Sequence, residues 1–256
     1  MPAQHQALLE SYLHQFKLPM FAQNYQAFAQ DALRTNLSYE RYLLALCTAE
    51  AEQRDAHRIE RCIAAAKFPL LKDLSNFDFS LVQNVSKQKV LELSQGGYMA
   101  KAETIILIGN PGLGKTHVAT ALALAACKQG KKVRFYGVAS LVNDLLSAQK
   151  DLRLSKFSTK LVKLDVLVLD ELGFVPFGKD GGQLLFQLCS DLYERVSIIV
   201  TTNLRFADWN QVFGDERMTA ALLDRLTHKA HILEFVGESY RFRQRLQQEV
   251  TKVEAS

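Results

Sequence analysis

The sequence predicts an α/β protein in which a parallel sheet carries helices on both faces and follows a small all-helical region. Short apolar, β-branched runs alternate with helical segments from about residue 81 onward, which is typical of a parallel sheet. A glycine-rich loop joins the first of these runs to a helix, whereas residues 1–66 show only helical spacing. We therefore expect a helical domain over residues 1–66 and an α/β domain over residues 67–256.

The N-terminal region contains three helical patterns. Ser38 is a suitable N-cap for the third of them, with Glu40 in its first turn. The charged stretch that follows mixes signs, as on a solvated helix face. The region is too small for a catalytic domain, so we predict an interaction domain over residues 1–66, after which Lys67-Phe68-Pro69 breaks the helical pattern. The apolar residues at helical spacing are Leu8, Leu9, Tyr12, Leu13 and Phe16, then Phe21, Tyr25 and Phe28, then Tyr42, Leu43, Leu46 and Cys47.

The α/β domain alternates in a regular order. The run 166–169 is continuously apolar, as expected for a central parallel strand that is covered on both faces. The expected strands are residues 104–108, 132–136, 166–169, 197–203 and 231–235. The expected helices are residues 81–95, 116–128, 139–163, 182–195 and 219–227.

The loop between the first strand and its helix fits the phosphate-binding pattern of a glycine, four free positions, Gly-Lys and then Ser or Thr. Glycines let the backbone turn tightly and bring its N–H groups close to a phosphate. Lys115 is predicted to reach the β- and γ-phosphates of ATP, and the Thr116 hydroxyl to bind Mg²⁺. The predicted ATP-binding residues of this loop are Gly109, Asn110, Pro111, Gly112, Leu113, Gly114, Lys115 and Thr116.

Polar residues close two later strands. Asp170 and Glu171 follow the apolar run 166–169, and the carboxyl ends of parallel strands share the edge where ligands bind. Asp170 is predicted to hold Mg²⁺, and Glu171 to polarise the water that attacks the γ-phosphate. Asn203 ends the next strand and could orient that water, although a simple polar turn would look the same. The pattern predicts an ATPase with Lys115, Glu171 and Asn203 as catalytic residues.

The aromatic residues before the first strand and a basic stretch before the second motif can each be interpreted in two ways. Phe77 and Phe79, just before the first strand, could line a pocket for the adenine base or belong to the core. A basic stretch before the second motif could neutralise nucleic-acid phosphates or form an ordinary solvated helix face. Its members are Lys150, Arg153, Lys156, Lys160 and Lys163.

Composition excludes several classes of protein. The net charge of +4 permits nucleic-acid binding without requiring it. The four cysteines lie far apart, without metal-ligand spacing, and indicate reduced thiols in a cytoplasmic protein. The N-terminus lacks the features of a secretory signal, and the longest strictly apolar run, residues 121–127, is far too short to span a membrane. We expect no membrane partner.

The chain resembles the AAA+ ATPases of the helicase-loader and replication-initiator clade over nearly its whole length. Within that clade it is most similar to the IstB-type helper ATPases of insertion-sequence transposons. The loop and the Asp-Glu pair are generic to many ATPases, and the C-terminal stretches narrow the resemblance. The matching stretches are residues 13–18, 50–54, 109–119, 169–173, 201–203, 209–215, 222–226 and 237–241.

The resemblance implies further roles. Arg225 matches the arginine finger that reaches the ATP of a neighbouring subunit, which implies a homo-oligomer, and Arg241 matches the second sensor of nucleotide state. Arg217 and Arg243 are competitors for these two positions. The basic stretch lies where this clade inserts helices that face DNA. Few residues remain after Arg241, so the C-terminal helical lid is expected to be truncated or absent.

The resulting expectation is an ATP-dependent helper of transposition. It would oligomerise on duplex DNA, engage a transposase and use ATP hydrolysis to control target selection. One alternative is a replicative helicase loader of the same clade, which a neighbouring transposase gene would argue against. Another is a nucleotide-gated DNA scaffold without turnover, against which Glu171 argues. A small-molecule kinase would need an acceptor site and an arginine-bearing lid, and the sequence shows no obvious lid.

Overall fold

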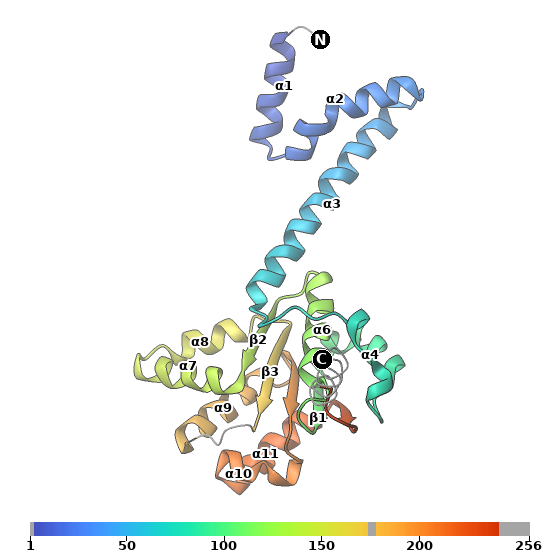
Figure 1. Cartoon of the computed structure of the whole chain (residues 1–256). Coiled ribbons are helices and arrows are strands. Elements are labelled where there is room, and N and C mark those ends of the chain that lie inside the picture. The colour runs from blue at the N-terminus through green and yellow to red at the C-terminus, as the bar shows by residue number, and fades with distance from the viewer. Residues whose placement is uncertain (1–2, 174–177, 241–256) are drawn as a thin grey trace, which may run out of the picture. The chain divides into compact units, whose positions relative to one another are not determined.

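The computed structural model describes residues 3–173 and 178–240 and divides into two compact units, Met1–Arg61 and Cys62–Ser256 (Figure 1). The boundary between the units falls within helix α3, Tyr39–Ala66. The domain limits predicted at residues 66 and 67 stay a prediction.

The N-terminal unit consists of α1 (Ala3–Gln15), α2 (Pro19–Arg34) and most of α3, as the helical spacing predicts. Its helices are joined through Glu50, which is only 5% exposed although it is charged. The Glu50 carboxylate accepts hydrogen bonds from Met20 N at 2.9 Å and Arg54 Nε at 2.8 Å. Arg54 Nη2 also donates to the carbonyl of Lys17 at 2.7 Å. A buried charge needs such partners, so this cluster fixes the turn between α1 and α2 against α3.

The second unit contains a five-stranded sheet in the order β2-β3-β4-β1-β5, and all neighbouring strands are parallel. The predicted parallel α/β fold is therefore confirmed. The carboxyl ends of β1, β3 and β4 lie along one edge of the sheet, which places the sequence motifs together. The strands are β1 (Thr104–Gly109), β2 (Val133–Gly137), β3 (Val166–Leu172), β4 (Ser197–Thr202) and β5 (Ala230–Phe235).

Helices cover both faces of this sheet (Figure 1). Successive side chains of a strand point to opposite faces, so Val166 and Val168 join the core beneath α6, while Leu167 and Leu169 join the core beneath α7 and α9. All four are fully buried, and each contributes roughly 1.5–3 kcal/mol of hydrophobic stabilisation. The helices of this unit are α4 (Lys87–Ser94), α5 (Gly97–Ala100), α6 (Lys115–Lys128), α7 (Val138–Lys150), α8 (Leu154–Leu161), α9 (Lys179–Leu192), α10 (Asn210–Phe213) and α11 (Glu216–Thr227).

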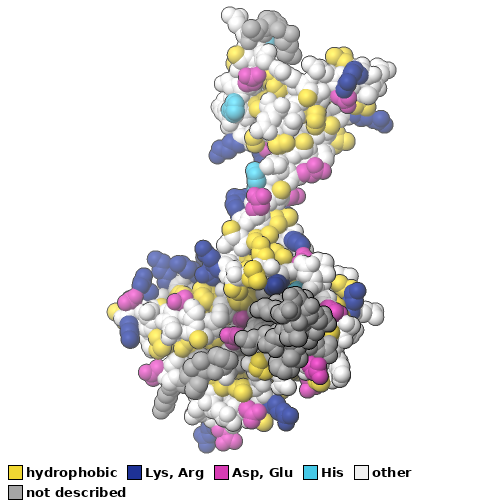
Figure 2. Space-filling view, viewed as in Figure 1, with side chains coloured by type: hydrophobic (Ala, Val, Ile, Leu, Met, Phe, Trp, Pro, Cys, Tyr) yellow, Lys and Arg dark blue, Asp and Glu magenta, His cyan; other side chains and the backbone are white. Residues whose placement is uncertain are grey.

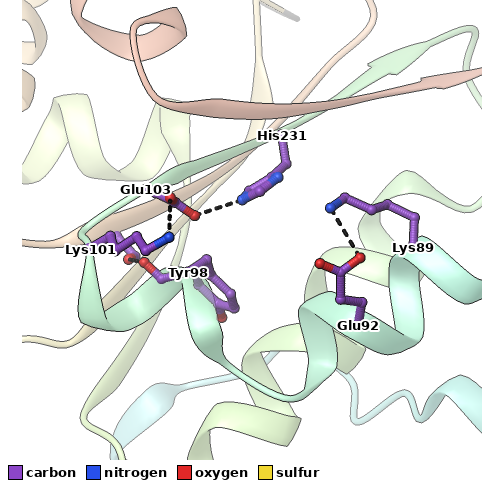
Figure 3. A network of polar contacts seen from close by, with 7 residues as sticks. Lys89, Glu92, Tyr98, Lys101, Glu103 and His231 are labelled. Atoms are coloured by element: carbon purple, nitrogen blue, oxygen red, sulfur yellow. Dashed lines mark hydrogen bonds and ion pairs between the residues drawn. The ribbon is translucent and has the colours of Figure 1, made fainter.

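Polar contacts hold the amino ends of β1 and β5 together. Glu103, just before β1, accepts a hydrogen bond from the ring of His231 on β5 at 2.8 Å and lies 3.8 Å from the Lys101 ammonium (Figure 3). The Ser197 hydroxyl of β4 donates to the carbonyl of Tyr98 at 3.2 Å. These contacts lie at the amino ends of the strands, whereas the sequence motifs lie at the carboxyl ends.

Four predicted helix limits were wrong by three or more residues, two of them because of local capping side chains. The helix expected from residue 81 begins only at Lys87, because the Ser86 hydroxyl caps it by accepting from Lys89 N, and short 3₁₀ turns precede it. The helix expected from residue 219 begins at Glu216 after the Asp215 cap. The helix expected over 182–195 is α9, which begins earlier, at Lys179, and ends earlier, at Leu192. The predicted truncated lid falls among residues 241–256, outside the described residues.

The cysteine and membrane predictions can be compared with the described residues. All four cysteines are free, and burial raises the pKa of the Cys127 and Cys189 thiols to about 12. Within residues 3–173 and 178–240, no group of three or more His, Cys, Asp or Glu residues could hold a metal ion by itself. No helix in that part of the chain is long and apolar enough to cross a membrane.

Candidate functional site

The loop that follows β1 needs glycine at three positions. Gly109, Gly112 and Gly114 have φ angles of 147°, 82° and 88°, which side chains disfavour. A Cβ atom at Gly109 would also lie 2.2 Å from the carbonyl oxygen of Phe235. At Gly114 it would lie 2.5 Å from the ring of Phe77. The backbone conformation therefore requires glycine at these three positions, and at Gly109 and Gly114 neighbouring atoms also leave no room for a Cβ atom.

Lys115 opens helix α6 and is buried although it is charged, with 7% exposure. Its Nζ donates to the carbonyls of Gly109 and Asn110, both at 2.7 Å, so the ammonium lies within the curve of the loop. Leu113 anchors the loop in the core, whereas Asn110 and Pro111 are exposed. The backbone N–H groups at the start of α6 face the same loop, which is a favourable place for an anion.

Thr116 and Asp170, predicted to bind metal from α6 and β3, are brought together. The Thr116 hydroxyl donates to Asp170 Oδ1 at 2.9 Å. The Thr201 hydroxyl of β4 donates to the same oxygen at 2.7 Å. Asp170 is 7% exposed and Thr201 is 1% exposed, so these bonds form largely away from solvent. Thr116 and Asp170 fit the oxygen ligands that Mg²⁺ takes in phosphate-binding sites.

Glu171 and Asn203 also lie at the carboxyl ends of their strands, β3 and β4. Glu171 is exposed and has a φ angle of 60°, which is rare for a residue with a side chain. Its backbone N–H donates to the Thr201 hydroxyl at 2.9 Å. Asn203 follows Thr202, which pairs with Ile108 at the end of β1, so Asn203 is half-buried beside the start of the glycine loop.

Sequence reasoning did not assign a role to Thr201. The available signal was its place in the run Thr201-Thr202-Asn203 after three apolar residues of the same strand. Alternation puts Thr201 on the face of Ile199, which is the α6 side of the sheet. The partner strand and its register, which make that position important, are not visible in the sequence.

Phe77 and Phe79 pack against the core beneath the loop, as the core interpretation predicts. Their rings lie edge to face at 4.8 Å, and the Phe77 ring lies 5.2 Å from that of His117 on α6. His117 Nε2 lies 2.9 Å from the carbonyl of Asp73, so the segment before the sheet is fastened to α6. The position of Phe77 against Gly114 leaves the adenine-pocket interpretation open.

Arg225 lies far from the glycine loop of its own chain. It is in the last turn of α11, where its guanidinium lies 5.1 Å from the ring centroid of Phe186 and donates to the carbonyl of Ala221 at 3.0 Å. It lines a small cavity with Thr104 and Val196, at the amino ends of β1 and β4. The loop follows the opposite end of β1, which is roughly 17 Å long at 3.3 Å per residue.

Of the other three arginines considered for the site, only one lies among the described residues. Arg217, the competitor of Arg225, is exposed in the first turn of α11. Arg241, predicted to sense the nucleotide, and its competitor Arg243 lie outside the described residues. Tyr240, just before Arg241, donates its N–H to the carbonyl of Gly112 in the loop at 3.0 Å.

The residues of the basic stretch are all exposed and lie on and around α8. Helix α8 buries Leu161 and packs Phe157 against the core, and Figure 2 shows dark blue side chains gathered over α7 and α8. Arg153 forms an ion pair with Asp151, and the nearby Leu152 is 95% exposed. The exposed cations here are the predicted Lys150, Arg153, Lys156, Lys160 and Lys163.

Comparison with known proteins decides the family. The family model described as IstB-like ATP binding protein matches residues 11–248. The chain belongs to this family. The IstB-like chain is 35% identical over 245 residues to a Geobacillus stearothermophilus protein named as an ATP-binding protein of insertion sequence IS5376, covering 95% of this chain and 98% of the relative. It is 40% identical over 239 residues to an insertion-sequence ATP-binding protein of Sinorhizobium fredii, covering 93% and 80%.

Solved structures confirm the AAA+ fold of this IstB-like protein. The DnaC helicase loader superimposes with a TM-score of 0.52 at 21% identity, covering 69% of this chain and 99% of that one. DnaA from Aquifex aeolicus, bound to AMPPCP, gives a TM-score of 0.56 at 19% identity, covering 71% and 56%. The chain is thus an ATP-binding AAA+ protein of insertion sequences, related in fold to helicase loaders and replication initiators.

Proposed function

We propose that this IstB-like protein hydrolyses ATP to ADP and phosphate and uses that cycle to control its assembly on duplex DNA during transposition. The observation that carries the proposal is the convergence of Thr116, Asp170 and Thr201 beside a glycine loop, with Glu171 next to them. A protein that only binds ATP has no need of a second, exposed carboxylate beside the metal-binding residues.

The residues at the loop have distinct roles in this proposal. Lys115 exchanges the loop carbonyls for the β- and γ-phosphate oxygens, which its short reach to Gly109 and Asn110 supports. The Thr116 hydroxyl donates its hydrogen bond to Asp170, which leaves the lone pairs of the Thr116 oxygen free for Mg²⁺. Thr116 and Asp170 would hold Mg²⁺, which would supply positive charge against the charge that develops during phosphoryl transfer.

Glu171 and Asn203 act on the water in this proposal. Glu171 orients the attacking water and accepts its proton, since its carboxylate is exposed at the carboxyl edge of the sheet. Asn203 holds that water or the γ-phosphate through its amide, which its position beside Gly109 supports. Arg241 senses the γ-phosphate, a role carried by the family resemblance and by the bond between Tyr240 and Gly112.

The position of Arg225 supports a shared active site in a homo-oligomer. It is separated from its own loop by the length of β1, so it serves as an arginine finger only for a neighbouring subunit. The exposed basic stretch supports contact with the phosphates of duplex DNA. The names of the relatives place them in insertion sequences, which supports a transposase as partner rather than a helicase.

The test is DNA binding and particle size, measured by mobility shift and light scattering. Wild type is compared in ATP and in ADP, and Glu171→Gln in ATP. ATP hydrolysis is measured in the same samples. Large DNA-bound assemblies in both ATP samples but not in ADP, together with ATP hydrolysis by wild type alone, support the proposal. Wild type that assembles without hydrolysing ATP would favour the nucleotide-gated scaffold, and protein that neither assembles nor binds DNA in any sample contradicts the proposed assembly.

A further inference from the structure

Thr201 of β4 contacts both acidic residues at the end of β3. Its hydroxyl donates to Asp170 Oδ1 at 2.7 Å and accepts the backbone N–H of Glu171 at 2.9 Å. The side chain is 1% exposed, so neither contact is readily replaced by water. One hydroxyl group has one proton and two lone pairs, which suffices for both bonds at once.

The register of the two strands explains why one side chain reaches both residues. Leu169 pairs with Val200 and Leu172 pairs with Thr202, so Asp170 and Glu171 together stand opposite Thr201. This is a β-bulge, which locally interrupts the ladder of backbone hydrogen bonds and redirects side chains. At this bulge the Thr201 hydroxyl, rather than a backbone carbonyl, receives the N–H of Glu171.

The backbone of Glu171 is strained at this point. Its φ angle of 60° lies in the left-handed region, which glycine and asparagine adopt far more readily than glutamate. Such a conformation persists only where the surroundings hold it. The bond from the Glu171 N–H to Thr201 holds the residue from the neighbouring strand.

We propose that Thr201 is a positioning residue for ATP hydrolysis. Its hydroxyl orients the Asp170 carboxylate together with Thr116, and it holds the backbone from which the Glu171 carboxylate projects. One buried group thereby couples the orientation of the metal-binding carboxylate to that of the proposed base. This inference rests on the proposed ATPase function, and it adds a residue of β4 to the site.

The test compares Thr201→Val, Thr201→Ala and Thr201→Ser with a matched control, Thr219→Val. Valine keeps the shape of threonine without the hydroxyl, whereas serine keeps the hydroxyl. Thr219 is likewise 1% exposed, and its hydroxyl donates to the Asp215 carbonyl at 2.7 Å within α11. The measurements are kcat and KM for ATP, thermal unfolding, and hydrogen exchange of the Glu171 amide without nucleotide.

We expect Thr201→Val and Thr201→Ala to lower kcat by about 10- to 100-fold, as the loss of a group that orients ligands does, with little change in KM. The Glu171 amide should exchange faster in both variants. Thr201→Ser should keep nearly wild-type kcat and amide protection, and Thr219→Val should behave as wild type in both readouts.

Two results would overturn the inference: unchanged kcat and amide protection in Thr201→Val, or a serine variant as impaired as the valine variant. If Thr201→Val does not fold, the comparison of alanine with serine decides in the same way. If wild type itself does not turn over ATP, the proposed function fails, while the exchange of the Glu171 amide still tests whether Thr201 holds that backbone.

Discussion

At the scale of single residues, the loop shows how space and backbone conformation restrict the sequence together. Gly114 combines a φ angle of 88° with a neighbour, Phe77, that leaves no room for a methyl group. Gly137 has an ordinary φ angle of −69°, and no atom lies within 4 Å of the position that a Cβ would take, so it tolerates a side chain. The two glycines therefore differ in what they contribute.

Gly114→Ala should lower the free energy of unfolding by about 1–2 kcal/mol from backbone strain alone and should weaken ATP binding. Gly137→Ala should leave ATP binding unchanged and stability unchanged or slightly higher. Thermal unfolding and titration with a fluorescent ATP analogue measure both effects. Equal behaviour of the two variants would show that the loop tolerates a side chain.

At the scale of elements, the segment before the sheet is tied to α6 at two points. His117 contacts the Asp73 carbonyl near the start of α6, and the Lys128 ammonium lies 2.7 Å from the Asp73 carboxylate near its end. The hydrogen bond from Lys128 lowers the pKa of Asp73 to about 2, and the Ser75 N–H adds to this. The stability from this pair is present above the usual pKa of 3.8 and is lost as pH falls toward 2.

Lys128→Met should therefore destabilise the protein at pH 7 and lose that deficit as pH falls from 4 toward 2. The pair is partly exposed, so the expected effect is below about 1 kcal/mol. Urea unfolding across this pH range measures it, with Lys89→Met of the surface pair with Glu92 as control. A deficit that stays constant with pH would assign the effect to packing instead of to the ion pair.

The second element of interest is α8 with its basic face. If it contacts DNA phosphates, Lys156→Gln with Lys160→Gln should weaken DNA binding and reduce the salt slope of log K by about 0.9 per lost contact. The control is the double change Lys87→Gln with Lys101→Gln, at exposed positions on α4 and after α5. Mobility shifts at several salt concentrations measure the slope. The same loss in both doubles would indicate net charge alone, not a DNA-binding face.

At the scale of the whole molecule, Arg225 lies near the amino ends of the strands, whereas the glycine loop follows the carboxyl end of β1. In the proposed function, a complete active site therefore needs two subunits, one that supplies the loop and one that supplies Arg225 as the arginine finger. The consequence is that two differently inactivated subunits can complement each other.

Arg225→Ala should lower kcat on the order of 10³-fold while ATP still binds. Lys115→Ala should lose ATP binding. A mixture of the two should recover part of the activity, because some interfaces then pair an intact loop with an intact Arg225. Since Arg225 also stacks on Phe186, thermal unfolding serves as the control for folding. A folded mixture without activity, beside an active wild type, would argue against a shared site.

Much of the fold and the site was predictable from local sequence. The strand, loop and helix around Lys115 are consecutive, so their residues specify the phosphate-binding geometry without help from the rest of the chain. Helix limits near Ser86 and Asp215 were misjudged because capping side chains decided them. The roles proposed for all of the site residues stay predictions, since each role depends on a bound molecule or a neighbouring subunit.

The sequence by itself determined the parallel α/β fold, the glycine loop and the pair Asp170-Glu171, because periodicity and short motifs act within a few residues. Only the tertiary structure decided that Thr201 bridges that pair, that Phe77 closes on Gly114, and that Arg225 lies at the far edge. These contacts depend on strand order and register. Strand order and register are set by packing between segments far apart in the chain, which no local pattern specifies.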